Sequence, residues 1–111
     1  MLAESYLNKI VRVKIDRPLN SFHPKYNFKY ELNYGFIENT ISGDGEELDA
    51  YVIGVNNPVD EFEGFCIAVI HRLNDDDDKL IVAPSDFTVS DEEIEKLTSF
   101  QEKWFSHIIV R

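Results

Sequence analysis

Proline and glycine residues interrupt this chain so often that they limit the secondary structure it can form. Most of the segments between them are too short for a helix of two turns. These segments are rich in Val, Ile, Tyr and Phe, which favour strands. The sequence therefore predicts a mainly β protein. The interruptions stand at Pro18, Pro24, Gly35, Gly43, Gly45, Pro58, Gly64 and Pro84.

Five segments have the pattern of strands. In the first, Val11, Val13 and Ile15 alternate with polar residues, which is typical of a strand with one buried face. The third and fourth segments are more continuously apolar, as central strands tend to be. The predicted strands are 10–16, 30–37, 48–55, 65–73 and 79–83.

The last part of the chain has a helical pattern. Residues 90–93 form a capping box, and their acidic side chains suit a helix N-terminus. Apolar residues then follow at helical spacing, namely Ile94, Leu97, Phe100, Trp104 and Ile108. We predict a helix over 91–105. Five strands and one helix predict a single domain over 1–111, mainly β (α+β), with a small barrel or curled sheet and the C-terminal helix packed across it.

The charge of the chain limits its partners and compartment. It has 21 acidic and 11 basic residues, a net charge of −10. This balance disfavours nucleic acid and an anionic membrane surface. No apolar run approaches the ~20 residues of a membrane span, and the first ten residues do not resemble a secretory signal. With Cys66 as the single cysteine, we expect a cytoplasmic protein.

Two acidic clusters stand at the ends of predicted strands, at 42–49 and 74–79. In the first, Asp44 and Glu46 point the same way on an extended backbone, and the glycines allow a turn that adds Asp49. Carboxylates that converge repel one another, and a hard cation such as Mg²⁺ offsets the repulsion. The alternative is a solvated acidic turn, and the second cluster alone is typical of a solvated linker.

Several motifs resemble the soluble, Mg²⁺-dependent (family I) inorganic pyrophosphatases. They are residues 33–37 (NYGFI), 44–49 (DGEELD) and 77–80 (DDKL), followed by Pro84. The similarity runs through most of the chain and is strongest between residues 30 and 84. It implies a five-stranded OB-like barrel and a hydrolase that splits pyrophosphate into two phosphates by attack of a metal-bound water. It also implies two or more Mg²⁺ ions, with Mn²⁺ as an alternative, and a homo-oligomer.

The resemblance assigns roles to individual residues. Asp49 bridges two metals, and Glu46 takes the proton from the attacking water. Tyr34 is a further catalytic group. The implied metal ligands are Asp44, Glu46, Asp49, Asp77 and either Asp75 or Asn74; the implied phosphate ligands are Lys25, Lys79, Tyr34 and Tyr30; Asp16 is an additional acidic site residue.

The chain departs from the family pattern in ways that predict weaker activity or a related phosphoanhydride substrate. It lacks, between Lys25 and Tyr30, the hairpin that carries a phosphate-binding arginine. Glu46 replaces an aspartate, and residues 104–105 (Trp-Phe) replace a Tyr-Lys pair that holds phosphate. The side chains left to fill this cationic gap are Lys29, Arg72 and Lys103.

Other interpretations stay open at this point. One is a catalytically idle metal-binding barrel that acts as a binding or regulatory module. Another is a binder of single-stranded nucleic acid, which the net charge disfavours. Trp104 and Phe100 are the residue types that stack on bases, but core packing is favoured for them. We expect His23 in a turn, His71 in a strand facing solvent or packed, and His107 at the helix end.

Overall fold

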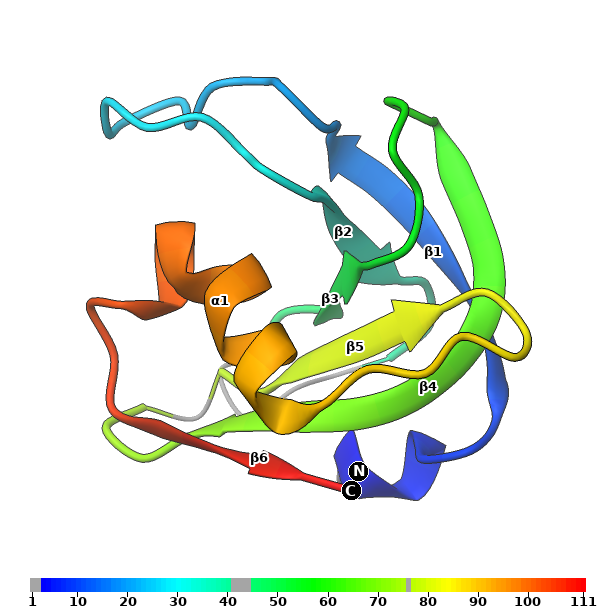
Figure 1. Cartoon of the computed structure of the whole chain (residues 1–111). Helices are drawn as coiled ribbons and strands as arrows, with labels where there is room; N and C mark the ends of the chain where they lie inside the picture. The colour runs from blue at the N-terminus through cyan, green and yellow to red at the C-terminus, as the bar shows by residue number, and fades with distance from the viewer. Residues whose placement is uncertain (1–2, 41–44, 76) are drawn as a thin grey trace.

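The computed structural model describes residues 3–40, 45–75 and 77–111 (Figure 1). A short 3-10 helix, η1, precedes the first strand, and one α-helix lies near the end of the chain. The elements are η1 (Ala3–Tyr6), β1 (Ile10–Arg17), β2 (Asn33–Ile37), β3 (Leu48–Val52), β4 (Glu61–Arg72), β5 (Lys79–Ala83), α1 (Asp91–Glu102) and β6 (His107–Val110).

Five strands close into a barrel in the order β1-β2-β3-β5-β4, because β4 pairs back onto β1. The pairing of β3 with β5 is parallel, and the other pairings between these named strands are antiparallel. The long strand β4 makes closure possible, since its first residues pair with β1 and its later ones with β5 and β6. The barrel and the helix confirm the predicted fold class.

The core has two parts. One cluster takes side chains from all five barrel strands, among them Val13, Ile37 and Leu80, and fills the barrel. The other includes Tyr51, Ile81 and the helix residues Ile94 and Phe100, and lies between the sheet and α1. Alternate residues of β3 and β5 enter different clusters. Both faces of these strands are therefore buried, which explains their continuous apolar runs.

The strand boundaries differ from those predicted. β2 begins at Asn33 instead of Tyr30, and β3 ends at Val52 instead of Val55. β4 begins at Glu61, four residues before the predicted start. Its first residues alternate acidic and apolar, and Arg12 of β1 pairs with Glu63 at 3.2 Å. This part of β4 is held by β1, so a search for continuous apolar segments misses it.

The end of the chain corrects the predicted helix. The Ser90 side chain caps α1 by accepting from the Glu93 amide, as the capping box predicts. The helix stops at Glu102, and His107 begins β6, which pairs with β4. The interpretation of His107 as a helix-end cation is therefore wrong. The segment His-Ile-Ile-Val has strand propensity, and β4 offers it an unpaired edge.

No helix in the described part of the chain is both long and apolar enough to cross a membrane.

Gly35→Ala tests the close approach of β2 to β1. A Cβ on residue 35 would lie 1.8 Å from the carbonyl oxygen of Lys14, so the two strands would have to separate. We expect the free energy of unfolding, measured by urea titration, to fall by at least about 4 kcal/mol.

Gly45→Ala is the control for this substitution. Gly45 has a φ of +86°, and an added Cβ there meets nothing within 4 Å among the described residues. Backbone strain alone predicts a loss of about 1 kcal/mol. Equal losses in the two variants would contradict the close approach.

The contact between β6 and α1 predicts a pH-dependent contribution to stability. His107 Nε2 lies 2.6 Å from Glu95 Oε1. Burial lowers the pKa of His107, but its bonds to Glu95 and to the Phe105 carbonyl outweigh burial, and the pKa is raised above 6.5. The contribution is therefore complete below pH 6.5 and is lost as the pH rises through the folded-state pKa.

Urea titrations of Glu95→Gln check this expectation. The variant should lose up to about 1 kcal/mol of unfolding free energy at pH 6, because Glu95 is half exposed, and less at pH 9. Glu92→Gln, an exposed position on the same helix, serves as the control. A loss in Glu95→Gln that is the same at both pH values would count against the pair.

Candidate functional site

A cavity of about 770 Å³ lies between the barrel, the loop after β1 and the C-terminal end of α1. Figure 1 shows this loop, in cyan, on the same side of the barrel as the helix. Side chains from β1, β2, β3, β4 and β5 all reach the cavity. Its lining is Asp16, Arg17, His23, Tyr26, Asn27, Phe28, Tyr30, Tyr34, Asp49, Arg72, Asp77, Lys79, Gln101, Lys103, Trp104 and Phe105.

A buried lysine joins two carboxylates in this cavity. Lys79 Nζ lies 2.7 Å from Asp49 Oδ2 and 2.7 Å from Asp77 Oδ2. The parallel register of β3 and β5 places Asp49 directly beside Lys79. The Tyr34 hydroxyl donates to Asp49 Oδ2 at 3.0 Å. Lys79 is only 2 % exposed, and an ammonium group this deep needs such partners.

Burial and mutual repulsion alter the acidity of these groups. Burial raises the pKa of Asp77, and the Asp49 charge adds to this, while Lys79 opposes it. Burial also raises the pKa of Asp16, with a further contribution from Asp49. The pKa of Tyr34 is raised by burial and by Asp49, so Tyr34 remains a hydroxyl donor. Added positive charge would stabilise all three carboxylates.

A second buried pair ties the helix to the barrel. Arg72 donates to Glu102 through Nε at 3.0 Å and Nη2 at 2.7 Å, which is a bidentate arrangement. The Tyr51 hydroxyl donates to the same carboxylate at 2.6 Å. The Arg72 guanidinium lies 3.7 Å from the centre of the Phe105 ring. Glu102 therefore holds a cation of β4 in a fixed place at the cavity wall.

The third nitrogen of the Arg72 guanidinium, Nη1, faces the acidic residues before β5. Arg72 Nη1 lies 3.4 Å from Asp77 Oδ2 and 3.5 Å from Asp75 Oδ2. Of the three candidates for the cationic gap, Arg72 and Lys103 line the cavity, whereas Lys29 is exposed on the loop outside the lining. Arg17 adds a further cation that sequence reasoning missed.

The structure brings together part of the predicted site. Asp16, Tyr30, Tyr34, Asp49, Asp77 and Lys79 all line the cavity. Asp75 is exposed and reaches this group through Arg72. Lys25 and Glu46 are exposed and stand outside the described lining. Asp44 lies outside the described residues.

Trp104 corrects another expectation. Core packing was favoured for Trp104 and Phe100, and Phe100 is indeed buried in the contact between sheet and helix. Trp104 is 58 % exposed and lines the cavity. The helix ends at Glu102, two residues before Trp104, so Trp104 is not part of the apolar helix face that the spacing of apolar residues predicts for it.

One oxygen in the cavity suits a metal ion. Asp77 Oδ1 is buried and finds no hydrogen-bond partner in the part of the chain that the structure describes. A divalent cation would satisfy this oxygen, and Mg²⁺ needs few carboxylates because it keeps several waters. The Asp49 and Asp77 carboxylates, both bound to Lys79, therefore fit one hard cation with water completing its shell.

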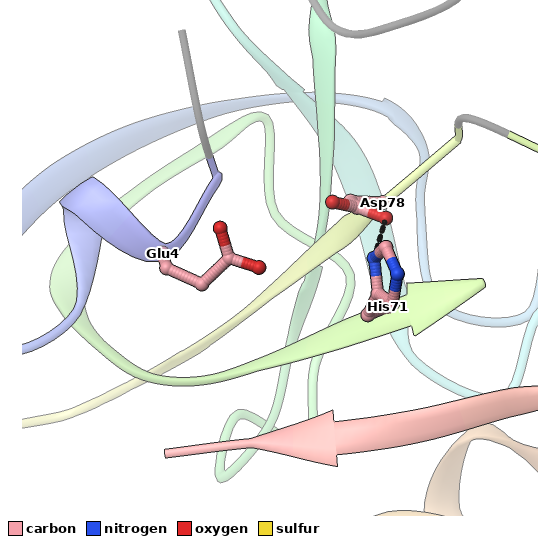
Figure 2. A group of neighbouring side chains, drawn as sticks. All are labelled: Glu4, His71 and Asp78. Carbon is pink, nitrogen blue, oxygen red and sulfur yellow. Dashed lines mark hydrogen bonds and ion pairs between the residues drawn. The ribbon is translucent and has the colours of Figure 1, made fainter. Parts of the chain in front are cut away.

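Elsewhere in the described structure, three other side chains bring possible metal-ligand atoms close together. Among the described residues, Glu4, His71 and Asp78 bring ligand atoms within 4.8 Å of one another. Figure 2 shows Asp78 bonded to the His71 ring, with the Glu4 carboxylate nearby; His71 Nδ1 and Asp78 Oδ1 are 2.9 Å apart. None of the three lines the cavity. His71 lies in β4, as predicted, and its side chain is partly exposed and partly packed against Asp78.

Comparison with known proteins gives a family match over most of the chain. The family model for inorganic pyrophosphatase matches residues 6–109. The chain is 38% identical over 81 residues to an inorganic pyrophosphatase of Streptomyces coelicolor, covering 67% of this chain and 45% of that protein. It is 41% identical over 80 residues to one from Halalkalibacterium halodurans, covering 66% and 44%. The chain thus spans less than half the length of these relatives.

Solved structures have the same fold. An inorganic pyrophosphatase from Ehrlichia chaffeensis aligns with a TM-score of 0.69 at 22% identity, over 91% of this chain and 84% of that one. One from Coxiella burnetii aligns with a TM-score of 0.66 at 19% identity, over 88% and 78%. At these identities the alignments establish the barrel architecture.

Glu102→Gln tests the buried pair. The substitution removes the charge that Arg72 neutralises and leaves a buried guanidinium without its main partner. We expect the free energy of unfolding in urea to fall by about 3–5 kcal/mol. Glu93→Gln, at an exposed position on the same helix, should cost under about 1 kcal/mol. Similar losses in both variants would mean that the pair adds no stability of its own.

Proposed function

The chain belongs to the inorganic pyrophosphatase family, and on that premise we propose that its cavity binds pyrophosphate with a divalent cation and hydrolyses it to two phosphates. The observation that carries the proposal is the cluster of Asp49, Asp77 and Lys79 in one cavity, with Tyr34 bonded to it. Carboxylates for a cation and an ammonium for a phosphate thus occupy the same wall.

Asp49 and Asp77 would hold the cation, with Asp75 next to them across Arg72. Asp44 and Glu46, which precede β3 in the sequence, remain proposed ligands, and Glu46 remains the proposed proton acceptor. The cation, Mg²⁺ or Mn²⁺, would supply positive charge to an acidic protein and lower the pKa of the reacting water. Two or more ions, a homo-oligomer and a cytoplasmic location remain predictions.

The chain's own cations would bind and orient the substrate. Lys79 contacts both carboxylates, and its ammonium group would be available to a phosphate oxygen if a cation shared Asp49 and Asp77. Glu102 holds the Arg72 side chain in place. Binding of a phosphate by the remaining N–H groups of Arg72 would therefore cost little further conformational entropy. Arg17 and Lys103 line the same cavity. These side chains support binding of a diphosphate despite the net charge of −10.

Asp16, Tyr30 and Tyr34 would shape the remaining wall. The Tyr30 hydroxyl donates to Gln101 at 2.9 Å, which connects the loop to the helix. Tyr34 donates to Asp49 and fixes the orientation of that carboxylate. Lys25 is exposed and lies outside the described lining, so it would contribute little to phosphate binding in the cavity. We therefore expect slower turnover than in the longer relatives.

Asp49→Asn tests the proposal. The variant keeps the shape of the side chain but removes the charge that faces Lys79 and the cation. We expect phosphate release from pyrophosphate with Mg²⁺ to fall at least about 100-fold. Circular dichroism and urea titration would show whether the variant is folded.

Asp86→Asn is the matched control, because Asp86 lies outside the described lining and has a φ of +63°, which asparagine tolerates. It should retain wild-type turnover. Metal binding by the wild-type protein with no turnover of any phosphoanhydride would instead favour the idle, regulatory barrel.

A further inference from the structure

Aromatic rings form a continuous lining from the charged wall of the cavity to its mouth. Tyr34, which is bonded to Asp49, stacks on Tyr30 with ring centres 5.4 Å apart. Tyr30 contacts Phe28 at 5.5 Å, and Phe28 contacts Trp104 at 5.5 Å. All of these rings line the cavity. Pyrophosphate has no apolar group to place against the Phe28 and Trp104 rings.

The rings at the mouth are left open to solvent. Tyr26 is 65 % exposed and Trp104 is 58 % exposed. They stand on different segments, the loop after β1 and the segment after α1, with Phe28 and His23 between them: His23 lies 4.8 Å from Tyr26 and 5.0 Å from Phe28. Large rings exposed together at a cavity mouth mark a surface that gains from contact with another flat, apolar group.

His23 adds a fixed, uncharged ring to this group. Its Nδ1 accepts hydrogen bonds from the amides of Lys25 at 3.0 Å and Tyr26 at 3.2 Å, which confirms the predicted turn. Burial, together with the charges of Arg17 and Lys25, lowers its pKa below 6.5. The ring is therefore neutral at pH 7 and its orientation is set before a ligand arrives.

Cations lie beside these rings as well as in the charged wall of the cavity. Lys103 Nζ is 4.7 Å from the Trp104 ring centre. With Lys103, the side chains of Arg17, Arg72 and Lys79 give four cations among the described residues of the lining, where the described carboxylates are those of Asp16, Asp49 and Asp77. Aromatic faces next to cations are the combination that proteins use to stack a base and hold its phosphates.

The size of the cavity also exceeds what pyrophosphate needs. Its volume of about 770 Å³ lies within the range of ~300–1,000 Å³ found for pockets that enclose drug-sized organic ligands. Pyrophosphate and its cations would occupy the charged part of the cavity, and pyrophosphate has no flat organic group to place against the aromatic rings. A nucleotide has both parts, a flat base and a phosphate chain.

We propose that the cavity takes a nucleoside diphosphate, with the base against Phe28, Tyr26 and Trp104 and the diphosphate at Lys79 and Arg72. The inference rests on the proposed function, since it names the substrate class of the same site. In the reaction, the oxygen of water bonds to the terminal phosphorus and the bond from that phosphorus to the bridging oxygen breaks. The products are a nucleoside monophosphate, inorganic phosphate and a proton released to solvent.

A single nucleotide fits the charge of the protein better than a polymer does. An oligonucleotide carries many phosphates across a surface whose net charge is −10, and repulsion opposes its binding. A nucleoside diphosphate brings its charge only to the cavity, where the cations are gathered.

Intrinsic fluorescence offers a direct test, because Trp104 is the single tryptophan. Wild-type protein would be titrated with ADP, pyrophosphate and adenosine in the presence of Mg²⁺, with dissociation constants confirmed by calorimetry. We expect ADP to quench Trp104 and to bind at least about fivefold more tightly than pyrophosphate or adenosine. Phosphate release would be measured from ADP and from pyrophosphate under the same conditions.

Tyr26→Ala and Phe22→Ala form a matched pair of variants. Both residues are exposed aromatics of the same loop, at 65 % and 67 %, but only Tyr26 lines the cavity. Tyr26→Ala should raise the dissociation constant for ADP at least about fivefold and leave that for pyrophosphate unchanged. Phe22→Ala should change neither constant.

The outcomes separate this inference from the proposed function. Hydrolysis of pyrophosphate with no preference for ADP would overturn the inference and leave the proposed function intact. Tight, Tyr26-dependent binding of ADP without hydrolysis of either compound would support the nucleotide-binding site but overturn the proposed activity and the hydrolytic step of this inference. Equal weakening by Tyr26→Ala and Phe22→Ala, or binding of an oligonucleotide in preference to ADP, would also overturn the inference.

Discussion

The site depends on the contacts of the buried Lys79 ammonium group with two carboxylates. A charge at this depth is tolerated only because Asp49 and Asp77 both contact it. The parallel pairing of β3 and β5 creates this arrangement, since it sets Asp49 beside Lys79. The same pairing requires a crossover between the two strands, and β4 is the strand that makes it and also closes the barrel. Barrel closure and the charged wall therefore have one structural origin.

Most of the barrel was predictable because its strands carry their own pattern. Alternation in β1 and continuous apolar runs in β3 and β5 arise from burial of one face or two, which local sequence records. The start of β4 and the whole of β6 were missed for a common reason. Glu61 and His107 belong to strands because a neighbouring strand offers hydrogen bonds, and that neighbour is distant in sequence. Ile108 also continued the helical spacing, which concealed the end of α1.

The site divides in the same way. Tyr34, Asp49, Asp77 and Lys79 stand in short motifs, so a sequence comparison finds them and the structure places them in one cavity. Arg72 and Glu102 were not recognisable as a pair, since they are 30 positions apart and each resembles an ordinary surface charge. The exposure of Trp104 depends on where the helix stops. Position in the fold, more than residue type, decides which of these side chains reach the cavity.

Because Arg72 and Glu102 form a buried pair, the charged wall of the cavity tolerates substitution less well than the mouth of the cavity does. The polar side chains of the charged wall connect the barrel to the helix, so substitutions in this wall disturb folding. Tyr26 and Trp104 at the cavity mouth are largely exposed, so we expect substitutions there to cost less stability than substitutions in the charged wall. Natural drift or laboratory evolution can therefore exchange residues at the cavity mouth and retune ligand preference while the charged wall stays the same.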